Sequence, residues 1–169
     1  MAFTGFSAAA FDFYGRLETD NTKAFWQANK STYDREIKGA FDELSQALSA
    51  RFGDFHVFRP HRDVRFSKDT SPYKNHAGAV SATSDAETYY VQVSGEGLFV
   101  GCGMYTLASD QLQRWREAVV DQKSGVMIEG IVAGLREKGY QIGAMESLKT
   151  APRCYAATPK ITPASNCCA

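Results

Sequence analysis

The sequence predicts an α+β protein in which N-terminal helices precede a central, mostly antiparallel sheet, and two C-terminal helices pack on that sheet. Three observations predict this order. Apolar residues recur at helical spacing in the first third of the chain, β-prone residues alternate in the middle third, and helical spacing returns after residue 109. Helices and strands that are segregated in this way are typical of α+β proteins.

Three helices are predicted before residue 54. Ser7 is a favourable N-cap residue, and residues 20–22 (Asp-Asn-Thr) predict a turn followed by a second helix start. A longer helix is expected from Ser31, and Gly53 is expected to end it. Its apolar residues follow steps of four, four, three and four: Tyr33, Ile37, Phe41, Leu44 and Leu48.

The middle third predicts strands joined by short turns. A short strand at residues 55–58 is interrupted by Pro60, which cannot donate to a ladder, so it is expected at a sheet edge or a bulge. Further strands are predicted at residues 77–83, 88–93 and 98–105, with a hairpin turn at residues 94–97. On the last strand, one face is expected to lie in the core: Leu98, Val100, Cys102 and Met104.

Two helices are predicted to follow, with Ser109 and Ser124 as their N-caps and Gly139 beyond the second. The chain of 169 residues suits one domain. We expect that domain to span residues 1–160 and residues 161–169 to form an irregular tail.

Composition narrows the class of protein. Hydrophobic residues make up 44% and charged residues 22%, as in ordinary globular proteins, and no apolar run approaches the length of a membrane span. The N-terminal residues lack the basic region of a secretory signal, so we expect a soluble, cytoplasmic protein. The net charge of zero disfavours wholesale coating of DNA. The four cysteines match no zinc motif, and neither a metal nor a cofactor is predicted.

Positive charge is concentrated in residues 59–76. This segment carries five Lys and Arg against two Asp, a balance of +3, so the rest of the neutral chain carries −3. A guanidinium group suits phosphate or carboxylate because its planar fork binds two oxygens at once. The hydroxyls and lysines of the following loop could wrap an anion, and Pro72 stiffens that loop. The glycines of a phosphate-binding Walker loop are absent.

Strand alternation predicts two faces in this segment. His61, Asp63 and Arg65 share one face, and Arg62 shares the other with Val64 and Phe66. Arg62 would need an internal partner if its face packed on helices.

Glycines on the strand 98–105 provide a second feature. Gly101 and Gly103 lie opposite the expected core face and could form a groove floor that a ligand approaches closely. The candidate ligand-binding residues are Arg62, Asp63, Arg65, Ser67, Lys68, Tyr73, Lys74, His76, Gly101 and Gly103.

Three interpretations of the basic segment stay open. It could bind an anionic small molecule, dock an acidic partner or a nucleic-acid backbone, or form a purely structural network of charges. Neither a catalytic residue nor an oligomeric state can be predicted from these residues.

Three stretches carry a resemblance to a known family. Residues 25–34 (FWQANKSTYD), 59–78 (RPHRDVRFSKDTSPYKNHAG) and 98–105 (LFVGCGMY) together resemble the bacterial and fungal family catalogued as domain of unknown function 2461. The family pattern is R-x-x-RDVRFSKDK-x-PYK, and Thr70 stands where members often have lysine. The resemblance implies no reaction. It does imply a shared signature of Arg62, Asp63, Arg65, Ser67, Lys68, Pro72, Tyr73 and Lys74.

The tail departs from the family pattern, because Cys154 stands where a glycine is expected and the last residues lack a helical pattern. Codons for residues 164–169, read one base earlier, can encode Arg-Leu-Glu-Leu-Leu-Arg, which suits a helix. We therefore hypothesise that the tail is out of frame and that the family domain is truncated.

Overall fold

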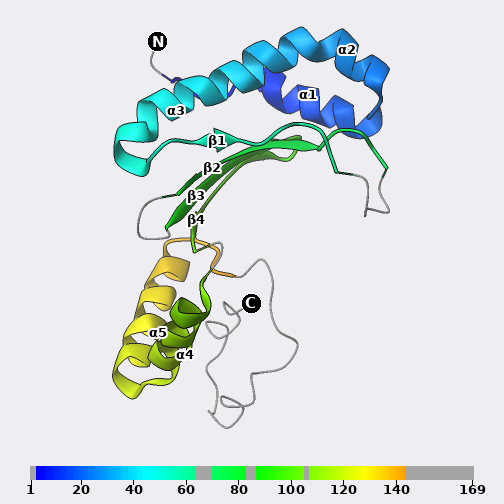
Figure 1. Ribbon diagram of the computed structural model, residues 1–169. Coiled ribbons are helices and arrows are strands. Elements are labelled where there is room, and N and C mark those ends of the chain that lie inside the picture. The colour runs from blue at the N-terminus through cyan, green and yellow to red at the C-terminus, as the bar shows by residue number, and fades with distance from the viewer. Residues whose placement is uncertain (1–2, 64–69, 83–86, 105–106, 144–169) are drawn as a thin grey trace. The chain divides into compact units, whose positions relative to one another are not determined.

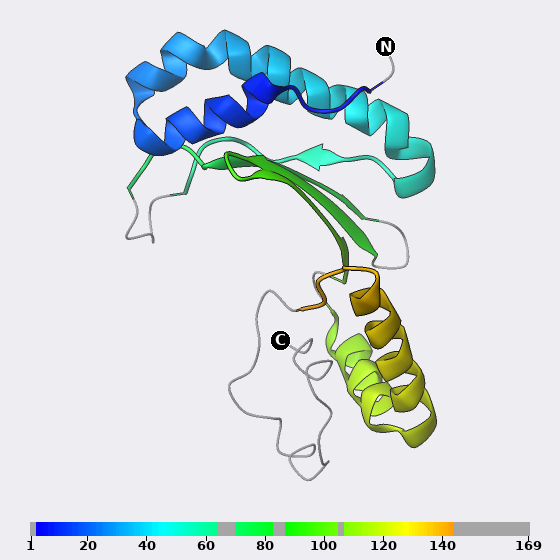
Figure 2. The ribbon, with the colours of Figure 1, turned by 180° about the vertical axis from the view of Figure 1, so that it is seen from behind.

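The computed structural model describes residues 3–63, 70–82, 87–104 and 107–143. The chain forms two compact units, Met1–Tyr105 and Thr106–Ala169, which are considered separately below (Figures 1 and 2). Helices occur toward both ends of the chain, and the sheet occupies its middle, as the sequence predicts. The single domain at residues 1–160 and the packing of the C-terminal helices on the sheet remain predictions.

Four helical segments form one layer of the first unit. Helix α1 (Ala8–Thr19) is followed by α2 (Lys23–Thr32), whose N-cap Thr22 accepts a hydrogen bond from the Phe25 N–H at 3.1 Å, as predicted. The helix does not restart at Ser31. It runs on through a π-helical segment η1 (Tyr33–Lys38) into α3 (Gly39–Phe52).

At the two ends of this layer, Ser7 is confirmed as the N-cap residue by position only, and the prediction for Gly53 is confirmed. Ser7 precedes α1 in extended conformation, but its hydroxyl makes no capping bond. It donates instead to the Glu36 carboxylate at 2.6 Å and so fastens the N-terminal segment to η1. Gly53 ends α3 with a φ of 77°, a conformation that favours glycine because it has no Cβ.

Four antiparallel strands form the sheet in the order β1-β2-β3-β4. They are β1 (His56–Val57), β2 (His76–Ala82), β3 (Thr88–Ser94) and β4 (Gly97–Gly103). The register pairs Ala79 with Val91, and Val91 with Val100. The short β1 lies at a sheet edge, as the following proline predicted.

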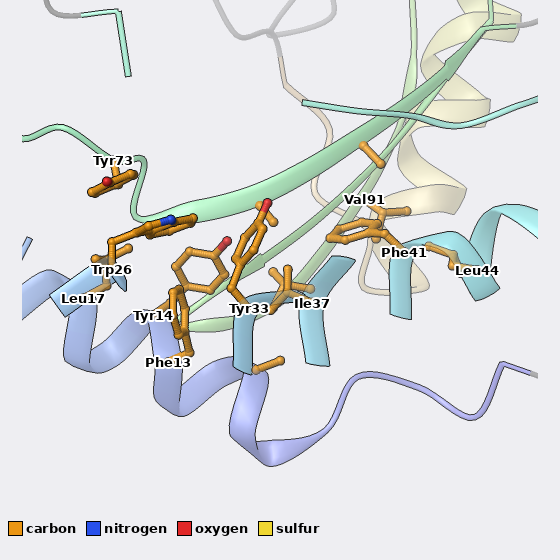
Figure 3. Close-up of a cluster of buried hydrophobic side chains, with 14 residues drawn as sticks. Phe13, Tyr14, Leu17, Trp26, Tyr33, Ile37, Phe41, Leu44, Tyr73 and Val91 are labelled. Atoms are coloured by element: carbon orange, nitrogen blue, oxygen red, sulfur yellow. The ribbon is translucent and has the colours of Figure 1, made fainter. Parts of the chain in front are cut away.

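The core lies between the helical layer and one face of this sheet, which we call the inner face (Figure 3). Ala77, Ala79 and Ser81 of β2 point inward and are 4%, 0% and 1% exposed. Their small side chains leave room for the large residues of the helices. These helical residues are Phe13, Tyr14, Leu17, Trp26, Tyr33, Ile37, Phe41 and Leu44.

The inner face of β4 corrects one prediction. Leu98, Val100 and Met104 are 55%, 64% and 54% exposed, and Cys102 is exposed as well, so these residues do not form core. The strand alternates as expected, but α1 contacts β3 and α3 contacts β2. The helical layer therefore lies over the middle strands, and β4 extends beyond it.

The second unit contains α4 (Ser109–Val120) and α5 (Gln122–Glu137). The N-cap of α4 is Ala108, so Ser109 was wrong as the predicted cap and is instead the first residue of the helix. Asp121, rather than Ser124, caps α5, because its carboxylate accepts hydrogen bonds from the N–H groups of Lys123 and Ser124. Gly139 follows the helix with a φ of 86°. Across the described ranges, no helix combines the length and the apolar character that a membrane span requires.

Candidate functional site

The basic segment folds as an extension of the β1–β2 pair. The Arg62 N–H donates to the Pro72 carbonyl at 3.0 Å, and the Lys74 N–H donates to the Pro60 carbonyl at 2.9 Å. These bonds flank an antiparallel bridge between His61 and Tyr73. Residues 60–62 and 72–74 thus form two antiparallel arms, which we call the hairpin.

The hairpin is not a uniform continuation of the sheet. The Phe58 N–H donates to the Gly78 carbonyl at 2.9 Å, and His61 then lies opposite Tyr73. Three steps lead from Phe58 to His61 on the first arm, whereas five lead from Gly78 to Tyr73 on the second. The second arm therefore contains two extra residues between these points, within residues 74–77. Two is an even number, so the bulge redirects the hairpin without exchanging its faces.

The inner face of the hairpin is anchored by stacking. Tyr73 is 5% exposed, and its ring lies on the indole of Trp26 from α2, with centroids 4.2 Å apart and planes 8° from parallel (Figure 3). The His61 ring lies beside both, 5.2 Å from the ring of Tyr73 and 6.4 Å from that of Trp26. Tyr73 is therefore part of the aromatic core, and the exposed His61 lies against it.

Asn21 completes this anchor from the turn between α1 and α2. At a bridge of this type, the N–H and C=O of Tyr73 point away from His61. The Asn21 amide takes both: its Oδ1 accepts from the Tyr73 N–H at 3.1 Å, and its Nδ2 donates to the Tyr73 carbonyl at 2.9 Å. Nδ2 also donates to Asn75 Oδ1 at 3.1 Å. The Asn21 side chain thus makes the two backbone hydrogen bonds that a neighbouring strand would make to Tyr73.

The outer face of the hairpin carries the positive charge. Alternation places Arg62, Lys74 and His76 opposite to His61 and Tyr73, away from the helices. The Lys74 ammonium lies over the Phe58 ring, 5.4 Å from its centroid, which is a cation–π contact. Arg62 and His76 are both partly buried. We call Arg62, Lys74 and His76 the basic cluster.

The electrostatics of His76 link the three residues of the basic cluster. Burial first, and then the positive charges of Lys74 and Arg62, lower the pKa of His76 below its ordinary value of 6.5. The positive charges of Lys74 and Arg62 therefore disfavour protonation of His76. Within the part of the chain that the structure describes, neither Lys74 nor His76 forms an ion pair with a carboxylate.

The other predicted site residues fall into two groups. Arg65, Ser67 and Lys68 lie outside the described residues, whereas Asp63 is described and exposed. Gly101 and Gly103 lie on the outer face, opposite Tyr90 and Thr88. The residue of β4 that lies level with His76 is Gly97, because His76 pairs with Ser94 and Ser94 pairs with Gly97. Gly101 is thus four residues along the sheet from the cluster, about 13 Å.

The expected groove floor is only partly open. A Cβ at Gly101 would lie 3.3 Å from the ring of Phe99, so this ring covers it, whereas a Cβ at Gly103 would meet no atom within 4 Å. The two glycines and the basic cluster share a face, but they do not form one site.

Sequence reasoning missed two kinds of residue. Asn21 gave no signal beyond its turn preference, because its role depends on a chain segment fifty residues away. Phe58, Tyr90 and Phe99 share the outer face, and strand alternation could have indicated this.

A second polar feature lies on the helical layer. Residues around Ser7, Arg35, Glu36 and Glu43 line a groove. The Glu36 carboxylate accepts hydrogen bonds from the Ser7 hydroxyl and from the Arg35 Nε, both at 2.6 Å, and these bonds lower its pKa. The carboxylate is already occupied by groups of the protein, so we regard it as a structural clasp.

The fold and the hairpin together define a class: an α+β protein with an antiparallel meander, covered by helices on one face and carrying a basic cluster on the other. Residues 9–165 match the model of a family described as conserved hypothetical protein (DUF2461). The chain belongs to this family, as its signature indicated. No curated protein and no solved structure matches it. Among the described residues, no three His, Cys, Asp or Glu side chains gather as metal ligands would.

Proposed function

We propose that this protein binds a small molecule bearing a phosphate or a carboxylate at the basic cluster of Arg62, Lys74 and His76. The loop residues Arg65, Ser67 and Lys68 would add to the site, as the sequence predicts. We keep the cytoplasm as the proposed location.

One observation carries this proposal: a partly buried histidine lies within the influence of two cations, on the face of the sheet opposite the helical layer of the first unit. Like charges that lie close together raise the free energy, and a nearby negative charge lowers it. Lys74 and His76 form no ion pair with a carboxylate of the described residues, so a bound anion would compensate their charge. It would also favour the protonated form of His76, which would then become a third cation for the ligand.

A thermal-shift screen tests the proposal on the full chain. Inorganic phosphate, sugar phosphates and small carboxylates are added, and a ligand at about 100 times its Kd stabilises the folded state by about 2.7 kcal/mol. Lys74→Met should abolish the shift, whereas Lys38→Met, which removes an exposed lysine of η1, should leave it unchanged. Equal shifts in the two variants would contradict the proposal.

Two rival functions give different results. If the cluster is purely structural, Lys74→Met lowers the melting temperature of the free protein and no anion raises it. If it docks an acidic partner or a nucleic-acid backbone, a polyanion binds with a steep dependence of log K on log salt concentration, whereas a single small anion gives a shallow one.

A further inference from the structure

Aromatic side chains cross the outer face of the sheet beside the basic cluster. The Phe58 N–H bonds to Gly78, Gly78 pairs with Gln92, and Gln92 pairs with Phe99. These residues therefore form one row across β2, β3 and β4, which Phe58 extends directly after the end of β1. We call the three rings of Phe58, Tyr90 and Phe99 the aromatic shelf.

Tyr90 fills the middle of this shelf. It belongs to the next row, but its ring leans over Gly78: a Cβ at Gly78 would lie 2.6 Å from the Tyr90 hydroxyl. The ring of Tyr90 is also 6.2 Å from that of Phe99. The absence of a side chain at Gly78 thus lets an aromatic ring lie low on the sheet.

The shelf differs from the core because two of its rings are exposed and that of Tyr90 is only partly buried. Phe99 is 55% exposed and Phe58 is 38% exposed, whereas Phe13 on the helical side is 1% exposed. Exposed aromatic rings on an antiparallel sheet are the surfaces on which proteins stack nucleobases, because every base has a π-face.

Polar groups on the shelf could contact the edge of a base. The Tyr90 hydroxyl donates to Gln92 Oε1 at 2.8 Å, which holds the Gln92 amide in place. The amide nitrogen of Gln92 makes no hydrogen bond to any described residue, so it can donate to an acceptor on a ligand.

The spacing joins the shelf to the basic cluster. Gly78, under the Tyr90 ring, is two residues from His76 along β2, which is about 7 Å on an extended strand. Lys74 touches the shelf directly, since its ammonium lies over the Phe58 ring. A single sugar bridges a gap of this size between a phosphate and a base.

We infer that the ligand of the basic cluster is a nucleotide unit, whose phosphate meets Arg62, Lys74 and His76 and whose base stacks on the shelf of Phe58, Tyr90 and Phe99. This inference rests on the proposed anion-binding function and names its ligand class. A free mononucleotide and a nucleotide within a single strand share this chemistry.

The test compares adenosine 5′-monophosphate with ribose 5-phosphate by calorimetric titration of the full chain. The two share the phosphate and the sugar, and only the first carries a base. Base stacking should make adenosine monophosphate bind about fivefold more tightly or better. Equal affinities would overturn the inference and leave the anion site intact, whereas no binding of either, or of inorganic phosphate, would overturn both.

β4 supplies a matched pair of variants. Phe99→Ala should reduce the affinity for adenosine monophosphate at least about fivefold, to that for ribose 5-phosphate. Leu98→Ala removes an equally exposed neighbour on the inner face, and both affinities should stay unchanged. Equal losses in the two variants would contradict the shelf. Phe58→Ala repeats the test at the opposite edge of the sheet, directly after β1, should Phe99→Ala not fold.

A third arm identifies the source of the nucleotide. Single-stranded hexa-adenylate that binds far more tightly than the monomer, and that loses affinity steeply with salt, would assign the site to a polymer with the same base and phosphate contacts. Affinities that match per site would assign it to the free mononucleotide.

Discussion

The two faces of the hairpin at residues 60–62 and 72–74 belong to one signature and have opposite physical characters. On the inner face, Tyr73 is 5% exposed, stacks on Trp26, and has both backbone polar groups bound by Asn21. On the outer face, Lys74 lies close to two other basic residues, Arg62 and His76. Among the described residues, no carboxylate forms an ion pair with Lys74 or His76. Successive residues of one motif thus have different roles. Tyr73 anchors the hairpin to the core, and Lys74 lies on its outer face.

The largest expected effect lies on the inner face. Trp26→Ala removes the ring on which Tyr73 stacks and leaves a cavity in the aromatic core, so the free energy of unfolding should decrease by about 3–5 kcal/mol. Urea denaturation measures this loss. Phe58→Ala, on the outer face, is the control and should cost less than half as much. Equal losses would remove the distinction between the faces.

Asn21→Ala should have the next largest effect. It leaves the N–H and C=O of buried Tyr73 without their partner, and we expect a loss of about 1–3 kcal/mol. Asn21→Asp keeps the acceptor for the Tyr73 N–H but removes the donor, and should fall between Ala and the parent protein. Gln27→Ala, at an exposed position of α2, is the control. A loss no larger than that of the control would show that the amide contributes nothing.

His76 should give the outer face a smaller, pH-dependent effect. Because its pKa is lowered on folding, the unfolded chain binds more protons than the folded protein on the acid side of neutrality. The contribution to stability is therefore present above pH 6.5, and it is lost as the pH falls through 6.5 to the folded pKa. Urea unfolding at pH 7.5 and 5.5 should show a smaller decrease for His76→Gln than for the parent protein. Identical decreases would contradict the lowered pKa.

Lys74→Met should change stability least, by no more than about 0.5 kcal/mol, because the residue is not part of the core. It should nevertheless raise the pKa of His76, since it removes one of the cations that lower it. Titration of the histidine ring signals by NMR measures this shift, with His76→Gln assigning the signal. Lys38→Met should leave it unmoved. An unchanged pKa in Lys74→Met would mean that the two side chains lie too far apart to share an anion.

The fold was largely predictable where short-range chemistry decides it. Thr22 caps a helix, Gly53 ends one, and the strands pair through the predicted turn before Gly97. The helix start expected at Ser31 was wrong, because a favourable cap residue also fits inside a helix when packing on both sides continues it. Leu98 and Val100 were wrong as core residues, because alternation predicts that they share a face but not how far the helices extend over it.

The candidate site was also predictable only where it depends on residues close together in the sequence. The charge of residues 59–76 is a property of the sequence, and Lys74 and His76 do come together with Arg62. Gly101 and Gly103 do not join them, because the strand register places them along the same face but at a distance. Tyr73, predicted as a ligand-binding residue, lies instead beneath the site as its anchor.

The sequence by itself determined which segments are helices and strands, where most of them end, and that positive charge gathers around one hairpin. These properties depend on residues within a few positions of each other. Only the tertiary structure decided that His61 and Tyr73 face the helices of the first unit, that Asn21 binds the hairpin, and that the Phe58 ring lies beneath the Lys74 ammonium. These outcomes depend on contacts between segments far apart in the chain, where burial and register, rather than local preference, set the free energy.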